Sequence, residues 1–178
     1  MIASENIAIR TVRRQDLPLL YALSQDFSNA GEFMPVSLVS ESEFYNTFDQ
    51  NGFWQDSCGR LVIEDNQHNI VGEIGSFKTA HYMNGREVYY RIFAGHRQKG
   101  YAKKALCLFT QFFFESTHFN RLQAVTVCEN VVSSAMLKKQ GFVYEGTLRQ
   151  GRWFKGNLVD LEMYSLLREE WKRTDSKL

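Results

Sequence analysis

One short segment of the chain combines basic side chains with a glycine at the start of a helical pattern. It reads Arg97-Gln98-Lys99-Gly100-Tyr101-Ala102. A glycine-containing loop that opens a helix leaves several backbone N–H groups unpaired and places the positive end of the helix dipole there. Both features suit a phosphate or pyrophosphate group. Gly100 permits close approach of the backbone, and Arg97 and Lys99 add positive charge, so the segment predicts a phosphate-binding loop.

Another candidate segment begins at Asn130 and lies after the next expected strand. It opens with Asn130-Val131-Val132-Ser133, continues as a short helical pattern and ends in Gln140-Gly141-Phe142. Asn130 is a good helix cap, and Ser133 places a hydroxyl in the first turn. The segment therefore predicts a capped helix, whose cap and first-turn hydroxyl are also candidates for contact with a ligand.

The two segments together resemble the motifs of the GNAT superfamily of N-acetyltransferases. The basic loop matches the signature R/Q-x-x-G-x-G/A, whose loop cradles the pyrophosphate of coenzyme A in that family. The segment from Asn130 resembles the family's N-x-x-S followed by a helix that ends in K-x-G-F. For the basic loop alone, a loop closed by a helix-starting glycine, without a ligand, is an equally good interpretation.

The tail of the chain extends the resemblance. Glu145-Gly146, Arg149, Gly156 and Asp160 resemble the subgroup that includes the ribosomal-protein serine and alanine N-terminal acetyltransferases (RimJ/RimL-like). This likeness implies transfer of an acetyl group from acetyl-CoA to a primary amine, by direct attack on the thioester and without a metal. The coenzyme contacts that it implies are Ile92, Phe93, Ala94, Arg97, Gln98, Lys99, Gly100, Tyr101, Ala102, Asn130 and Ser133.

The resemblance also suggests catalytic residues, although one position departs from the family pattern. Many family members protonate the departing thiolate with a tyrosine, but the matching residue here is Leu137, so Ser133 is the remaining candidate. Glu87 matches an acidic position at the start of the family's fourth strand and is the candidate general base. Glu73, on the preceding strand, competes with it, and either carboxylate could instead be a solvated or ion-paired strand residue.

The sequence does not identify the amine that accepts the acetyl group. An α-amine has a pKa near 7.7–8.0, so roughly a tenth of it is neutral at pH 7, whereas a lysine amine needs a stronger base. The lack of an obvious base mildly favours α-amines, such as a protein N-terminus, or other amines of low pKa. The alternatives are a small amine (a polyamine, an amino sugar, an antibiotic or a peptide toxin) and, with another activity class, a non-catalytic regulatory protein that binds acyl-CoA.

The elements that must position these residues can be read from the hydrophobic pattern. Strands are expected over 7–12, 61–63, 70–78, 87–93, 122–128, 142–149 and 158–166, and helices over 16–25, from 40 onward, over 102–113 and over 131–140. Residues 51–60 read as a loop, and Asn84-Gly85 as a hairpin turn. We expect an α/β chain of the α+β type. Its central sheet is mixed and mostly antiparallel, is flanked by helices and contains the splayed strand pair of the GNAT fold.

Length and composition limit the number of domains and the classes of partner that the chain can have. The chain has 178 residues with 44% hydrophobic residues and a formal net charge of +1. We expect a single domain over residues 1–178. The near-neutral charge argues against a nucleic-acid partner, and sparse cysteines with scattered histidines suggest no metal site. With no apolar run long enough for a membrane, we expect a cytoplasmic monomer or homodimer.

Overall fold

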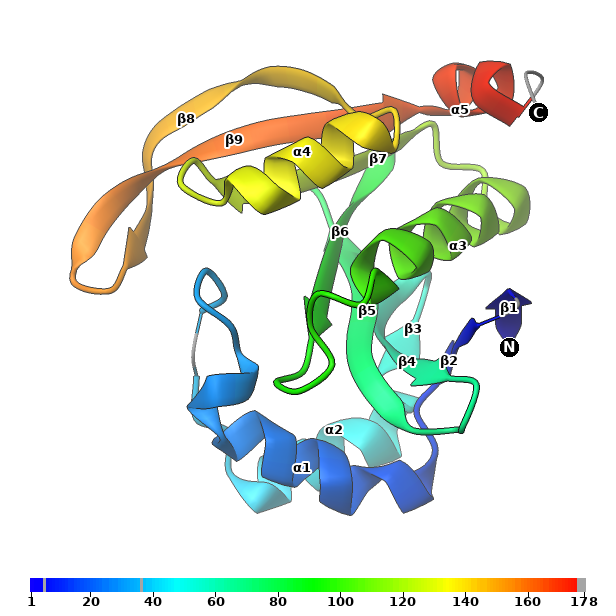
Figure 1. Ribbon diagram of the computed structural model, residues 1–178, viewed down its shortest axis with the longest axis vertical. Coiled ribbons are helices and arrows are strands. Elements are labelled where there is room, and N and C mark those ends of the chain that lie inside the picture. The colour runs from blue at the N-terminus through cyan, green and yellow to red at the C-terminus, as the bar shows by residue number, and fades with distance from the viewer. Residues whose placement is uncertain (5, 36, 176–178) are drawn as a thin grey trace. The chain divides into compact units, whose positions relative to one another are not determined.

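The computed structural model describes residues 1–4, 6–35 and 37–175. These residues divide into two compact units, and Figure 1 labels the elements of each. The first unit comprises Met1–Phe77 with Tyr89–Phe112, and the second comprises Lys78–Val88 with the chain from Phe113 onward. A single domain over the whole chain remains a prediction. Within the described ranges, no helix is both long enough and apolar enough to cross a membrane.

The first unit is built on strands in the order β1-β2-β4-β5-β6, with β3 paired to β4. The pairs among β1 to β5 are antiparallel. Ile7 and Ile9 of β2 alternate toward the core, and Ile9 lies opposite Ile63 of β4. The bounds are β1 Ile2–Ser4, β2 Ile7–Thr11, β3 Trp54–Gln55, β4 Cys58–Asp65, β5 Ile70–Lys78 and β6 Gly85–Ile92.

Two helices cover the core of this unit. Helix α1 (Leu17–Gln25) begins with proline in its first turn, and α2 (Glu41–Asn51) is capped by Ser40, whose hydroxyl accepts from the N–H of Glu43. Short 3-10 turns, η1 (Arg14–Asp16) and η2 (Phe27–Asn29), flank α1. The core joins Leu17 and Leu20 of α1 and Phe44 of α2 to Val12, Val62 and Phe93. The two predicted N-terminal helices are therefore present.

The second unit has the strand order β6-β7-β9-β8. Strands β6 and β7 are parallel over Gly85–Glu87 and Arg121–Gln123, and the other pairs of this unit are antiparallel. Helix α4 packs against β7 and β8. The mixed, mostly antiparallel sheet with flanking helices agrees with the predicted class. The bounds are α3 Tyr101–Ser116, β7 Arg121–Val127, α4 Val131–Lys139, β8 Val143–Phe154, β9 Asn157–Leu167 and α5 Arg168–Asp175.

Several details differ from the expectation. The predicted loop over 51–60 contains β3 and the start of β4, which form a tight hairpin through positive-φ residues Asp56 and Ser57. The turn before β6 lies at residues 81–82 instead of Asn84-Gly85. Gly85 is already paired in β6, where a Cβ would lie 2.7 Å from the carbonyl oxygen of Arg121. Close strand contact, and not turn geometry, therefore explains this glycine.

Candidate active site

The predicted phosphate-binding loop lies between the end of β6 and the start of α3. Gly100 has φ +78, and its carbonyl accepts from the N–H of Lys104 at 3.2 Å, so it opens the helix. Residues 97–100 are exposed. A Cβ on Gly100 would meet nothing within 4 Å, so crowding does not explain the glycine. The positive φ explains it, because glycine adopts this conformation without strain. An exposed, glycine-led start to a 16-residue helix fits the pyrophosphate of a coenzyme.

At the end of β6, where the resemblance implies coenzyme contacts, two backbone N–H groups already have protein partners. The N–H of Phe93 donates to the carbonyl of Val71 at 3.0 Å, and the N–H of Ala94 donates to Oδ1 of Asn29 at 3.0 Å. Phe93 is buried, whereas Ala94 is exposed. Residues 92–94 therefore form a fixed strand end, in which the N–H groups of Phe93 and Ala94 have protein partners.

The side chain of Arg97 is also committed within the first unit. Its guanidinium donates to the backbone carbonyls of Ile92, Ser28 and Asn29. The predicted positive charge is therefore present beside the loop, but its hydrogen bonds go to protein carbonyls.

The other candidate segment is the start of α4. Asn130 caps the helix, because its Oδ1 accepts from the N–H of Ser133 at 3.2 Å. Ser133 is half-buried. Leu137 is 0% exposed, so the position that holds a tyrosine in many relatives is a core position here.

Glu87 sits in a half-buried position on β6. Its Oε2 accepts from Nε2 of Gln123 at 2.8 Å, and Gln123 in turn accepts from Nε of Arg121 at 3.1 Å. Burial raises the pKa of Glu87, and the hydrogen bond from Gln123 offsets only part of this effect. A carboxylate with a raised pKa is a better proton acceptor, so this environment suits a general base.

The competing carboxylate, Glu73 on β5, has a different setting. It is 3% exposed and forms ion pairs with Arg91 and with Nε of Arg60, the latter at 3.2 Å. Two guanidinium groups hold its charge, which is the arrangement of a structural ion pair.

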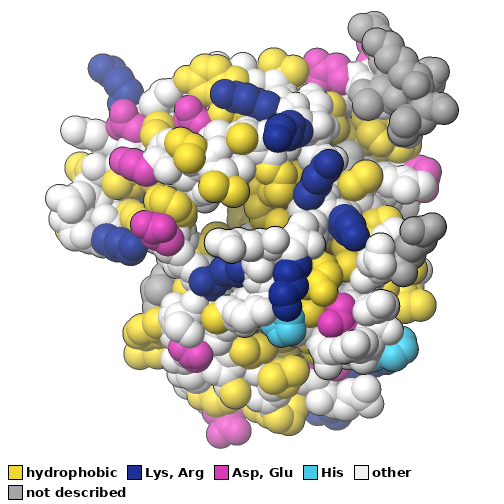
Figure 2. All heavy atoms as spheres, in the orientation of Figure 1, with side chains coloured by type: hydrophobic (Ala, Val, Ile, Leu, Met, Phe, Trp, Pro, Cys, Tyr) yellow, Lys and Arg dark blue, Asp and Glu magenta, His cyan; other side chains and the backbone are white. Residues whose placement is uncertain are grey.

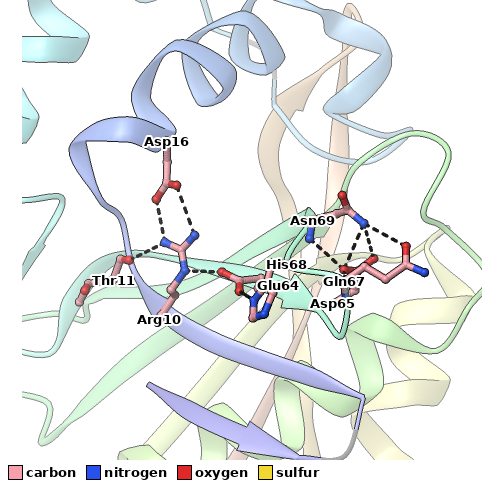
Figure 3. Close-up of polar contacts among 8 residues, drawn as sticks. All are labelled: Arg10, Thr11, Asp16, Glu64, Asp65, Gln67, His68 and Asn69. Carbon is pink, nitrogen blue, oxygen red and sulfur yellow. Dashed lines mark hydrogen bonds and ion pairs between the residues drawn. The ribbon is translucent and has the colours of Figure 1, made fainter.

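A pocket of about 620 Å³ lies beside the end of β6, within the first unit. A buried charge cluster forms part of its wall (Figure 3). Arg10 pairs with Asp16 through Nη1 at 2.7 Å and with Glu64 through Nε, and Glu64 also contacts His68. The cluster ties the start of α1 to β2 and β4. The rest of the wall is formed by Arg13, Gln15, Leu19, Leu23, Asn69, Ile70, Phe93, Ala94 and His96.

Sequence reasoning missed three polar residues that bond candidate residues or their neighbours in the two units. Asn29 lies in a stretch without a motif and gave no signal. Gln123 interrupts the apolar run of β7, and a buried amide on a strand signals a polar partner. Glu162 on β9 accepts from the hydroxyls of Ser134 and Tyr164, both at 2.6 Å, and only the structure places these side chains together.

Comparison with known proteins agrees with this geometry. The GNAT acetyltransferase domain model matches residues 6–143. The chain is 27% identical over 175 residues to the uncharacterized N-acetyltransferase p20 of Bacillus licheniformis, covering 94% of this chain and 96% of p20. A Bacillus subtilis protein named for ribosomal N-acetyltransferase activity, YdaF, is 33% identical over 116 residues, which cover 65% of this chain and 56% of YdaF. This partial match does not establish the RimJ/RimL-like subgroup.

The fold also matches solved structures. A spermidine N-acetyltransferase from Vibrio cholerae, crystallised with CoA and spermine, superposes with a TM-score of 0.83 at 19% identity, covering 95% of this chain and 99% of that one. The residues matched by the family model include the loop before α3 and the capped start of α4. The chain belongs to the GNAT family and is an acetyl-CoA-dependent N-acetyltransferase.

Proposed function

We propose that the N–H groups of residues 97–102, together with the start of α3, hold the coenzyme pyrophosphate. The positive φ of Gly100 and the exposure of the loop support this role. Bound acetyl-CoA supplies the thioester that is attacked. In the same unit, the end of β6 at residues 92–94 then lies beside the thioester. Asn130 and Ser133, in the second unit, remain predicted contacts of the coenzyme.

Glu87 takes the proton from the attacking amine, directly or through a water molecule. A polyamine amine has a pKa comparable to that of lysine, so nearly all of it is protonated at pH 7 and a base is needed. The raised pKa of Glu87 supports this assignment. The Ser133 hydroxyl donates a hydrogen bond to the departing thiolate, and the proton released by the attacking amine reaches the thiolate through water. Leu137 has no proton to donate, and the Ser134 hydroxyl is bonded to Glu162.

The acceptor is a small polycationic amine of the polyamine class. A charge pattern carries this proposal: from Gln15 to Gly59 the sequence has no Lys, Arg or His. In the family that the sequence resembles, the two helices near the N-terminus and the final hairpin shape the acceptor pocket, and this segment holds the two helices. Figure 2 shows scattered acidic side chains, among hydrophobic and uncharged ones, over the region where Figure 1 draws α1 and α2. The acidic residues of the segment are Asp16, Asp26, Glu32, Glu41, Glu43, Asp49 and Asp56.

Partners within the protein satisfy some of these charges. Asp16 pairs with Arg10, and Asp49 pairs with Arg14. Glu32, Glu41 and Glu43 are exposed. Exposed carboxylates of one sign raise the local concentration of cations and speed their association. The spermine found with the Vibrio cholerae enzyme is a ligand of this chemical class.

The test is thiol release from acetyl-CoA over spermidine, spermine, neutral monoamines, amino sugars and peptides that begin with Ser or Ala. We expect the highest kcat/KM for the polyamines, and we expect it to fall as salt rises. Glu41→Gln with Glu43→Gln should lower kcat/KM for spermine several-fold and leave a monoamine unchanged. Glu169→Gln makes the same kind of charge change on α5 and serves as the control.

Other outcomes identify other functions. Faster acetylation of peptides than of any polyamine, without an effect of the charge variants, would establish the protein N-terminal acceptor, which the YdaF match favours and which remains a prediction. Coenzyme binding without thiol release from any amine would point to a regulatory acyl-CoA-binding protein.

The coenzyme loop has its own test. Gly100→Glu forces a side chain into a positive-φ position and adds negative charge, so coenzyme A binding measured by calorimetry should be abolished. Gly156→Glu is the matched control, because Gly156 has φ +82 and open space in the β8–β9 turn. Normal binding by Gly100→Glu would remove this loop from the coenzyme site.

A further inference from the structure

Asn29 fastens the end of β6 to the turn that follows α1. It is 4% exposed, and its Oδ1 accepts from the N–H of Ala94 at 3.0 Å. Its Nδ2 donates to Oδ2 of Asp26 at 2.9 Å. Ala94 presents a donor and the Asp26 carboxylate presents an acceptor. The carboxamide of Asn29 satisfies both, which fixes its orientation.

Arg97 makes a second connection between the same two segments. Its Nε donates to the carbonyl of Ile92 at 3.0 Å. Its Nη2 donates to the carbonyl of Ser28 at 2.8 Å and to that of Asn29 at 3.2 Å. A planar guanidinium presents these donors in a rigid fork, which a lysine ammonium cannot reproduce. We call Asn29 and Arg97 together the β6 strap.

The opposite side of the strand end is held independently. The N–H of Phe93 donates to the carbonyl of Val71 on β5, and the Phe93 ring belongs to the core that includes Leu17 and Val62. Core packing therefore fixes Phe93, whereas its neighbours Ile92 and Ala94 are hydrogen-bonded to the β6 strap.

We propose that the β6 strap is a positioning device for acetyl transfer. It holds residues 92–94, which the proposed function places beside the thioester, and the inference rests on that placement. The hydrogen bonds from the strap to the end of β6 join backbone atoms, the carbonyl of Ile92 and the N–H of Ala94. Loss of the strap shifts the strand end without removing a group that touches the donor. A shift of about 1 Å in a positioned group can cost about 100-fold in rate.

The Arg97 side chain then has a different role from the one that its motif position implies. Three backbone carbonyls occupy its guanidinium, so this side chain is not a pyrophosphate ligand, although the family motif places an arginine there. Its N–H can still belong to the loop that holds the pyrophosphate. A positioning role of the Arg97 side chain and a pyrophosphate-binding role predict different rates with acetyl donors that have or lack the pyrophosphate.

The test compares two acetyl donors, acetyl-CoA and S-acetylpantetheine, which lacks the pyrophosphate. We expect Asn29→Ala and Arg97→Ala each to lower kcat by roughly 10- to 100-fold with both donors, while KM for acetyl-CoA changes by less than about threefold. Ser28→Ala keeps the backbone carbonyl and should stay within about twofold. Guanidinium ion should partly restore kcat of Arg97→Ala. A loss confined to acetyl-CoA would overturn the proposal and make Arg97 a pyrophosphate ligand.

Amide hydrogen exchange tests the strap without turnover. In the coenzyme-free protein, Asn29→Ala should speed exchange at Ala94, while Phe93 keeps its protection. Unchanged exchange at Ala94 would show that the strap does not hold the strand end. Faster exchange at Ala94 with unchanged kcat would show that the strap is real but that the thioester is not placed at residues 92–94, which is a failure of the proposed function.

Discussion

Glu73 and Glu87 are carboxylates on sequential strands with opposite surroundings. Glu73 lies between the guanidinium groups of Arg60 and Arg91, and both can share its negative charge. Glu87 receives a hydrogen bond from the neutral amide of Gln123, and burial raises its pKa. Burial penalises the charge of both residues, but only Glu73 is compensated by cations. The partner, not the burial, therefore separates an ion pair that supports the fold from a carboxylate suited to take a proton.

The largest expected effect concerns Glu87. Glu87→Gln keeps the size of the side chain and can still bond Gln123, but it cannot accept a proton. We expect kcat to fall about 100- to 1,000-fold near pH 7, in the range typical of a general base, with little change in thermal stability. The acid limb of the pH–rate profile should disappear with it. A rate within threefold of the parent would remove Glu87 from the mechanism.

Glu73→Gln should show the reverse pattern. It leaves Arg60 and Arg91 without their shared carboxylate, so we expect the free energy of unfolding to fall by about 2–3 kcal/mol. For a chain of this size, this corresponds to a loss of roughly 5–10 °C in Tm. The kcat per folded molecule should stay within about threefold. A large loss of kcat without a loss of stability would make Glu73 the base and reverse the comparison.

Sequence alone could not separate these two carboxylates, although it located most of the elements that carry them. The predicted strand at residues 70–78 and the helix after Asp16 agree with β5 and α1, because local patterns and caps specify them. The hydrogen-bond and ion-pair partners of Glu73 and Glu87 lie on other strands, distant along the chain. No local pattern records which distant arginine or glutamine meets a given carboxylate.

The same limit explains the rest of the candidate site. The glycine-led loop and the Asn130 cap were predictable, since each depends on neighbouring residues. The contact between Asn29 and Ala94 spans 65 positions and depends on tertiary structure. The role expected for the Arg97 side chain followed the family motif, whereas its guanidinium is bonded to three carbonyls of the protein.

Gln123→Met sharpens the comparison by removing the amide that donates to Glu87. The hydrogen bond from Gln123 stabilises the ionised form of Glu87, so its loss should raise the pKa of Glu87 further. The acid limb of kcat/KM should then move to higher pH, while the rate on the plateau stays within about threefold. Ser165→Ala, which removes a neighbouring hydrogen bond to Glu145 and leaves Gln123 and Arg121 in place, is the control. A limb that moves to lower pH would show that Gln123 does not stabilise the charge.

The smallest expected effect concerns Glu145, whose charge is held by a cation but whose side chain is 37% exposed. Hydrogen bonds from Arg121 lower its pKa to about 2, with a further bond from Ser165. A lowered pKa contributes stability above the unfolded value of 4.5, and that stability is lost as pH falls toward 2. Because solvent screens an exposed pair, we expect Glu145→Gln to cost only about 1 kcal/mol at pH 7. Urea unfolding between pH 3 and pH 7 should show this difference shrinking as pH falls, and a difference that grows would mean that Arg121 does not hold the charge of Glu145.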